Sequence, residues 1–350
     1  MKKFLALLLA LTMALALVAC GGGNDSSDTA TSGGDSESGF EPMTWKFACS
    51  ATETSPWVDG AKEFARIVGE KTGGAITVQY YPADQLTAGS QTDGIQALMD
   101  GTTEISMHSN LIWSSFDQRF NVVSLPFLFD STEEADAALD GAGGEALGEI
   151  LESTYNVHLL GIAENGFRHI TNSKHPIESL ADMNGLKMRV AGSQLLNRSY
   201  ELWGADYTNA NWSEVFTALQ TGTYDGQENP LPTADAASIQ EVQSYLTYWT
   251  GAYDCLFFCM NADLYNSLSP ELQAIVDEAG QEACTYEREL NRGQDQEIMD
   301  KWADAGVEVS ELSADAAAEF AEASAPVYDE FADELTPELI EAFTSVTQAE

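Results

Sequence analysis

Hydrophobic and polar residues recur along the chain in two patterns, one typical of strands and one typical of helices. Short apolar runs at 44–49, 76–81 and 187–190 have the length and the β-branched and aromatic content of strands. The segment between Ser55 and Gly73 instead places its apolar residues on one helical face, with a capping serine at its start and a glycine at its end. Such strands and helices alternate without a long break, which predicts an α/β fold.

The same reasoning extends to the rest of the chain. Further strands are expected at 104–107, 157–163, 167–171 and 256–260, and further helices at 91–100, 194–203 and 213–221. Ser131 opens a capping box and predicts one long helix as far as about Ser153. From Ser269, which precedes a proline, the pattern is strongly helical up to Gly306, and two more helices finish the chain.

The first forty residues have a different character. An apolar run from Phe4 to Ala19 follows two lysines and is shorter than the ~20 residues that a membrane-spanning helix needs, so residues 1–19 are predicted to be a secretory signal. The run ends in Leu-Val-Ala-Cys20, which resembles the lipobox of bacterial lipoproteins and predicts a lipidated Cys20. The polar and glycine-rich residues 20–42 are expected to be a flexible tether. An ordinary signal peptide with an incidental cysteine is the alternative.

One motif occurs twice. Residues 97–105 and 218–226 share Ala, Leu, Gly and Thr at matching positions, with Glu in the first against Asp in the second. The motif describes a helix that ends in a left-handed glycine and leads into a strand, and ligands bind beyond the far ends of such strands. Unless the match is chance, the repeat suggests two similar lobes that face each other across a cleft, with loops 107–110 and 227–231 beside it.

Charge and composition narrow the class of protein. The chain has 350 residues, with 15 Lys and Arg against 56 Asp and Glu, and a formal net charge of -41. A surface this negative repels phosphate backbones, which excludes nucleic-acid binding. Its 44% hydrophobic and 10% aromatic content nevertheless separates it from acidic chains that stay disordered. The length exceeds what one hydrophobic core usually supports and therefore favours two lobes.

No pattern of catalytic or metal-binding residues stands out. The histidines and cysteines lack the spacing of a metal site, and the sequence has no phosphate-binding loop, dinucleotide motif or nucleophile elbow, so neither a cofactor nor a catalytic residue is expected. His108, at a predicted strand end, is either a ligand contact or a structural residue. Cys255 and Cys259 are expected to be free buried thiols, because four residues of strand separate them too far for a disulfide.

Arginine is scarce, with seven in the chain. Arg168 and Arg189 differ from most of the others because they lie within or at the ends of short apolar strands. Each is either a structural ion pair with one of the many carboxylates or a fixed guanidinium that binds a ligand carboxylate through two hydrogen bonds. An anionic ligand of so negative a protein needs such a local positive charge.

Three segments give the chain a family resemblance. They are GFRHITNS at 166–173, SLADMNGLKMRV at 179–190 and SEVFTALQTGTYDGQENPL at 213–231. Together they resemble the signature of the DctP-type solute-binding proteins of tripartite ATP-independent periplasmic (TRAP) transporters, from about Met43 to the C-terminus. The resemblance implies a periplasmic-binding-protein-like α/β fold with two lobes, a cleft between them and a long helix within 270–305 that crosses both.

With that fold, lobe I is expected at 43–165 plus 255–295 and lobe II at 166–254 plus 296–350. The resemblance also implies ligand-binding residues. Its Leu-Lys-Met-Arg-Val arginine, here Arg189, binds the ligand carboxylate, and its Glu-Asn-Pro asparagine, here Asn229, reaches the ligand as well. Arg168 matches an arginine that adds a contact in some members, and Trp212 takes a usually aromatic position. On lobe I the expected residues are Ser50, Gln91 and Ser109.

Two positions depart from the family pattern. Ala191 follows the arginine motif where the family often has proline, and Asn211 stands before Trp212 where many members have proline. The bulky Trp212 and the neutral lobe I residues leave few charges for a second carboxylate. The pattern therefore favours a monocarboxylate that carries hydroxyl or apolar groups.

The expected function is that of an extracytoplasmic solute-binding lipoprotein, not of an enzyme. Held by its lipid on the outer face of the cytoplasmic membrane, at the cell surface or in the periplasm, it would deliver a small organic acid to the small and large integral membrane subunits of the transporter. Two other classes stay open. A binding protein of an ATP-driven importer would share the signal and the lobes but not the arginine and asparagine motifs, and a surface hydrolase would need a catalytic constellation.

Overall fold

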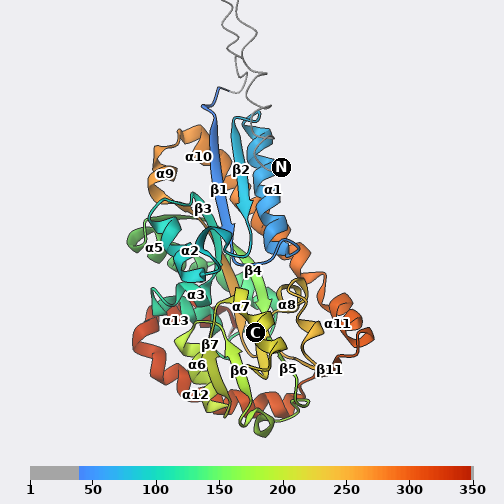
Figure 1. The fold of residues 1–350 in the computed structure, drawn as a ribbon. Helices are drawn as coiled ribbons and strands as arrows, with labels where there is room; N and C mark the ends of the chain where they lie inside the picture. The colour runs from blue at the N-terminus through green and yellow to red at the C-terminus, as the bar shows by residue number, and fades with distance from the viewer. Residues whose placement is uncertain (1–38, 348–350) are drawn as a thin grey trace, which may run out of the picture. The chain divides into compact units, whose positions relative to one another are not determined.

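The computed structural model describes residues 39–347, all of which belong to one compact unit (Figure 1). The predicted signal segment, Cys20 and most of the predicted tether lie outside the described residues. Two sheets organise the described chain, one of five strands and one of six.

The five-stranded sheet has the order β2-β1-β3-β10-β4. Its strands are β1 (Met43–Cys49), β2 (Ile76–Tyr81), β3 (Ile105–Ser109), β4 (Val157–Phe167) and β10 (Tyr253–Asn261). β1 pairs in parallel with β2 and β3, whereas β10 is antiparallel to its neighbours β3 and β4. Figure 1 shows α1 (Pro56–Lys71) beside β1 and β2, and the long helix α10 (Pro270–Arg292) packs against both α1 and β4.

Apolar side chains join these layers. The ring of Phe258 on β10 stacks on that of Phe47 on β1, with 5.0 Å between the centroids, and meets Phe64 of α1 edge-on at 5.0 Å. All three side chains are buried, so the sheet and α1 share one core. Aromatic pairs in this geometry stabilise a core beyond the area that they bury.

The six-stranded sheet has the order β11-β9-β5-β8-β6-β7. Its strands are β5 (His169–Asn172), β6 (Lys187–Val190), β7 (Asp206–Asn209), β8 (Gly226–Asn229), β9 (Tyr245–Tyr248) and β11 (Glu308–Glu311). β6 is parallel to β7 and β8, and β5 is antiparallel to β8 and β9. Trp203, Trp249 and Phe320 form a buried aromatic cluster on this side, with centroids 5.1 to 5.4 Å apart.

The remaining elements are mostly short helices. They are α2 (Gln91–Met99), α3 (Asn110–Trp113), α4 (Thr132–Leu139), α5 (Ala142–Thr154), α6 (Gln194–Leu202), α7 (Trp212–Gln220), α8 (Leu231–Ala236), α9 (Ala262–Ser267), α11 (Asp295–Asp304), α12 (Ala314–Leu335) and α13 (Pro337–Thr347), with 3₁₀ turns at Gln85–Thr87, Gln118–Ser124, Leu180–Met183 and Ile239–Glu241. α12 lies along α6, and α13 packs on α4 and α5.

The structure corrects one predicted helix. The single helix expected at 131–153 is wrong, because α4 ends at Leu139 and α5 starts at Ala142. Gly141 has extended backbone angles there, φ -112° and ψ -150°, and a Cβ on it would lie 2.7 Å from the Ala137 carbonyl oxygen. The chain therefore turns at this glycine instead of continuing the helix.

The lobe boundaries stay a prediction. α13, which the expected boundaries assign to lobe II, buries Phe343 in one cluster with Leu147 of α5, in the stretch assigned to lobe I. The C-terminal helices therefore tie both parts together. Cys255 and Cys259 are free and buried, as predicted, and so are Cys49 and Cys284.

The repeated motif is a repeated structure. α2 and α7 are both followed by a glycine at φ +72°, Gly101 and Gly222, and each then leads into a strand, β3 or β8. The two strands belong to different sheets. The repeat therefore supplies one strand end to each side of the molecule, as the sequence indicated.

Candidate ligand-binding site

A cavity lies where strands from both sheets end. The carboxyl ends of the parallel strands β1 and β3 approach it from the five-stranded sheet, and those of the parallel strands β6 and β8 from the six-stranded sheet. Open α/β sheets bind their ligands at this edge. All seven residues expected from the sequence line the cavity, namely Ser50, Gln91, Ser109, Arg168, Arg189, Trp212 and Asn229. The volume is about 30 Å³, room for roughly two water molecules.

Arg189 is a buried cation without a carboxylate partner among residues 39–347. Its side chain is 2% exposed, and its Nε and Nη2 both donate to the Ala210 carbonyl oxygen, at 3.0 and 2.7 Å. The indole of Trp212 lies beside the guanidinium, with 5.6 Å from Cζ to the ring centroid. Burial lowers the pKa of Arg189 to about 10, although Glu228 opposes this shift. Three of the five N–H donors of a guanidinium thus remain available at the cavity.

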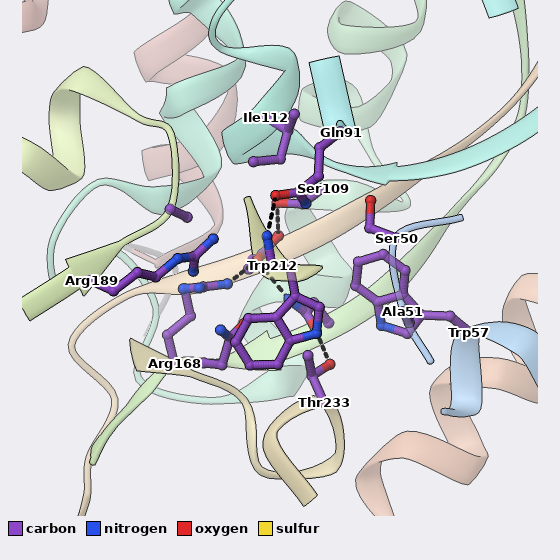
Figure 2. A pocket seen from close by; sticks show the side chains of 14 residues that line it. Ser50, Ala51, Trp57, Gln91, Ser109, Ile112, Arg168, Arg189, Trp212 and Thr233 are labelled. Atoms are coloured by element: carbon purple, nitrogen blue, oxygen red, sulfur yellow. Dashed lines mark hydrogen bonds and ion pairs between the residues drawn. The ribbon is translucent and has the colours of Figure 1, made fainter. Parts of the chain in front are cut away.

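Arg168 is buried too, but its charge is neutralised. It donates to the carboxylates of Glu228 and Asp254 and, at 2.8 Å, to the Glu228 carbonyl oxygen. Burial alone lowers the pKa of Arg168, but attraction to these two carboxylates outweighs that effect and raises it. The structural ion pair, one of the two alternatives for this residue, is therefore present. Figure 2 shows the two guanidinium groups on the same side of the cavity.

Neutral hydrogen-bonding groups complete the walls. Ser109 Oγ donates to Asp254 Oδ1 at 2.7 Å, and Asn165 Nδ2 donates to Asp254 Oδ2 at 2.7 Å. Thr233 Oγ1 in turn donates to Asn165 Oδ1 at 2.6 Å. Asn229 Nδ2 donates to the side chain of Gln227 at 3.0 Å. These bonds hold the polar side chains in fixed positions around the space.

Trp57 adds an unpaired donor. Its side chain is 3% exposed and lines the cavity, and its indole Nε1 is buried with no hydrogen-bond partner in the part of the chain that the structure describes. A buried N–H without an acceptor is costly. Arg189, with its remaining donors, and Trp57 lie on opposite sides of the view in Figure 2.

Sequence reasoning missed half of the lining. The additional residues are Ala51, Trp57, Ile112, Asn165, Ala191, Thr233 and Asp254. The helical spacing of Trp57 predicts a core residue, and it gives no sign that the side chain also lines the cavity. Asp254 did carry a signal, since an acidic residue at the start of a wholly apolar run needs a buried partner.

Comparison with known protein families shows to which family the chain belongs. A family model described as DctP, bacterial extracellular solute-binding protein, family 7, matches residues 47–335. The chain belongs to this family. The DctP-type resemblance that three sequence segments carried is thereby confirmed.

Members of the DctP family with known ligands resemble the chain over most of its length. The 2,3-diketo-L-gulonate-binding periplasmic protein YiaO of Escherichia coli is 32% identical over 274 residues, which cover 78% of this chain and 83% of the relative. A sugar acid binding protein from Advenella mimigardefordensis, solved with galactonate, is 30% identical, with a TM-score of 0.85 over 88% of this chain and 98% of that chain. A TRAP periplasmic solute binding protein from Sulfitobacter sp., solved with β-D-galacturonate, is 32% identical, with a TM-score of 0.82 over 87% of this chain and 100% of that chain.

These relatives confirm the predicted two-lobed α/β fold and place the chain among DctP-type extracytoplasmic binding proteins. Among residues 39–347, no helix is both long enough and apolar enough to span a membrane. Within the same residues, no cluster of three or more His, Cys, Asp or Glu side chains is arranged to hold a metal ion.

Proposed function

We propose that the chain captures a small hydroxylated monocarboxylate outside the cytoplasm and hands it to the two integral membrane subunits of a TRAP-type transporter, without covalent chemistry. Membership of the DctP family supports the TRAP transporter over an ATP-driven importer. Arg189, Asn229 and Trp212 would bind the carboxylate end, with Arg168 nearby.

The observation that carries the proposal is that Arg168 is ion-paired with two carboxylates, whereas Arg189 keeps N–H donors free of carboxylate partners among residues 39–347. One buried cluster carries two negative charges, on Glu228 and Asp254, and one positive charge, on Arg168. The neighbouring Arg189 adds a second positive charge. Arg189 keeps three N–H donors for a carboxylate, which a guanidinium binds through two parallel hydrogen bonds. One carboxylate is therefore matched in geometry, and a second carboxylate would find no further unpaired arginine at the cavity.

The remaining lining favours hydroxyl groups on the ligand. The lining has neutral donors and acceptors on Ser50, Gln91, Ser109, Asn165 and Thr233. Galactonate and β-D-galacturonate, the ligands of two relatives, each combine one carboxylate with several hydroxyl groups. A ligand of this kind suits a polar, largely uncharged wall opposite one arginine.

The space inside the cavity is smaller than the space that such a ligand fills. Its volume of about 30 Å³ holds roughly two water molecules. Entry of a sugar acid therefore requires the two sides of the cavity to separate and then to close again. Closure is a shift of population toward the state that the ligand prefers, by no more than that preference in free energy.

Arg189→Ala tests the proposal. Loss of a buried charged contact with the ligand carboxylate should cost about 2–5 kcal/mol, an increase in Kd of roughly 30-fold to several thousandfold. Isothermal titration with galactonate, β-D-galacturonate and 2,3-diketo-L-gulonate measures this against the wild type. Arg198→Ala is the matched control, because Arg198 lies on the surface in ion pairs with Glu201 and Glu330. Equal affinity of the wild type and Arg189→Ala would refute the assignment.

We also propose that Cys20 carries the lipid that holds the protein on the outer face of the membrane, with residues 21–42 as a tether. The lipobox-like sequence that ends at Cys20 supports this. Cys20→Ser should move the protein from the membrane fraction to the soluble fraction of cells, and Cys284→Ser, which changes a buried free thiol, should not. Membrane retention of Cys20→Ser would contradict lipidation at this residue.

A further inference from the structure

Two helix N-termini meet beside the cavity and cap each other. α2 begins at Gln91 and α7 begins at Trp212. The Gln91 N–H donates to Asn211 Oδ1 at 3.5 Å, and the Trp212 N–H donates to Gln91 Oε1 at 3.2 Å. The first N–H of a helix has no partner within that helix. Here each helix receives its missing acceptor from the other.

Asn211 does not act as an ordinary cap. An asparagine at this position usually accepts a hydrogen bond from its own helix. Asn211 precedes α7 but makes no side-chain bond to that helix, because its amide is turned toward α2. A third bond runs alongside, from Ser213 Oγ to the Gly89 carbonyl oxygen at 3.1 Å. A Cβ at Gly89 would lie 2.5 Å from Ser213 Oγ, so the close approach depends on that glycine.

The two helices belong to different cores. α2 buries Ile95 and Leu98 in the cluster that contains Trp113, whereas α7 buries Val215 in the cluster that contains Trp302. The mutual caps therefore join the two cores, and Trp212 itself packs in the second cluster. Because each bond links residues of the two sides, separation of the sides would break it.

The caps also lie at the boundary between two spaces. Gln91 and Ile112 line both the inner cavity and an outer cavity of about 200 Å³, and Asn211 lines the outer one. Asn211 does not line the inner cavity. A solute that leaves by this route must first separate Gln91 from Asn211 and Trp212.

We propose that the mutual caps of Gln91, Asn211 and Trp212, with the Ser213–Gly89 bond, form a latch that holds the cavity closed, and that Asn211 is a positioning residue that sets how long the solute stays. The latch rests on the proposed function of solute capture. Because its bonds form only in the closed state, they raise the fraction of closed protein and lower the apparent Kd in proportion. One net hydrogen bond corresponds to a factor of about 3 to 10.

The first test is the kinetics of Asn211→Ala, measured by stopped-flow tryptophan fluorescence with galactonate, β-D-galacturonate and 2,3-diketo-L-gulonate. The dissociation rate should rise about 3- to 10-fold, while the association rate changes less than about twofold. The rise should be the same for all three acids, because the substituted residue, Asn211, does not line the inner cavity. Loss of a direct contact would instead change the three rates unequally.

Ser213→Ala and Asn197→Ala complete the set. Ser213→Ala removes the parallel bond and should raise the dissociation rate by about the same factor. Asn197 is the matched control, since its amide exchanges hydrogen bonds of 2.9 and 2.8 Å with Asn209 on the same side of the cavity. Asn197→Ala should leave the dissociation rate unchanged. If Asn211→Ala and Ser213→Ala both dissociate at the wild-type rate, the latch is wrong.

A second measurement needs no solute and separates the latch from the proposed function. Thr77 on β2 and Gln220 at the end of α7 are exposed and lie on the two sides. Spin labels on cysteines at these positions report the distance between the sides by pulsed electron resonance. Asn211→Ala should shift the solute-free distribution toward longer distances. If none of the acids binds the wild type, the proposed ligand class fails, while an unshifted distribution would overturn the latch itself.

Discussion

Two arginines that look alike in the sequence have different partners in the fold. Both arginines are buried, Arg189 within β6 and Arg168 between the end of β4 and the start of β5. Arg168 has carboxylates on two sides, whereas the partners of Arg189 within residues 39–347 are the Ala210 carbonyl oxygen and an indole ring. The two carboxylates hold Arg168 in a structural ion pair, whereas three N–H donors of Arg189 remain for a solute.

This difference predicts opposite effects of the same substitution. Arg168→Met leaves the buried carboxylates of Glu228 and Asp254 without their cation, which should lower the free energy of unfolding by about 3–5 kcal/mol. Arg189→Met removes a buried charge that no carboxylate pairs with, so its unfolding free energy should change by less than about 1.5 kcal/mol. Urea denaturation of both variants without solute measures the contrast.

In ligand affinity, the variant with the larger loss should be Arg189→Met and not Arg168→Met. Arg189→Met should lose affinity for sugar acids, because Met has no donor for a carboxylate. If Arg189→Met were the less stable protein, the assignment of structural and binding roles to the two arginines would be wrong.

At the residue scale, local motifs predicted half of the cavity lining and missed the rest for a physical reason. Arg189 and Asn229 lie inside segments with a family resemblance, so the sequence alone located them. Asn165 bonds to Asp254, and Thr233 bonds to Asn165, each across a long stretch of chain. No pattern of spacing records such contacts, since they depend on where the sheets bring distant residues.

At the scale of elements, capping chemistry made the helix starts predictable. Ser55 and Ser269 accept hydrogen bonds from the first turns of α1 and α10, as their positions before proline indicated. The break between α4 and α5 was not predicted, because the residues around Gly141 are compatible with a continuous helix. The extended backbone of Gly141 is seen only in the structure. Local sequence determines where a helix is favoured, whereas packing decides whether it continues.

The order of the strands within each sheet could not be predicted from the sequence, for a related reason. β10 is inserted between β3 and β4, although about 90 residues separate it from β4 along the chain. Its apolar run predicted a buried strand but not which neighbours that strand joins. The mutual caps of α2 and α7 are likewise invisible locally, because each helix supplies only one half of the arrangement.

At the scale of the whole molecule, the net charge opposes the approach of the anion that the cavity is proposed to bind. The chain carries a formal charge of -41, while the cavity offers the N–H donors of Arg189, which forms no ion pair among residues 39–347. The buried guanidinium acts over a short range at the end of the approach. Before that, an anionic solute meets the field of the acidic surface, which repels it.

The association rate should therefore increase with ionic strength. Raising salt from 0.01 to 0.15 M shortens the screening length from about 30 to about 8 Å, which weakens the long-range repulsion more than the contact with buried Arg189. Stopped-flow tryptophan fluorescence with galactonate, using Trp57 and Trp212 beside the cavity, should show the association rate rising by about 3- to 10-fold while the dissociation rate stays nearly constant. An association rate that falls with salt would mean that the positive cavity, rather than the acidic surface, governs the approach of the solute.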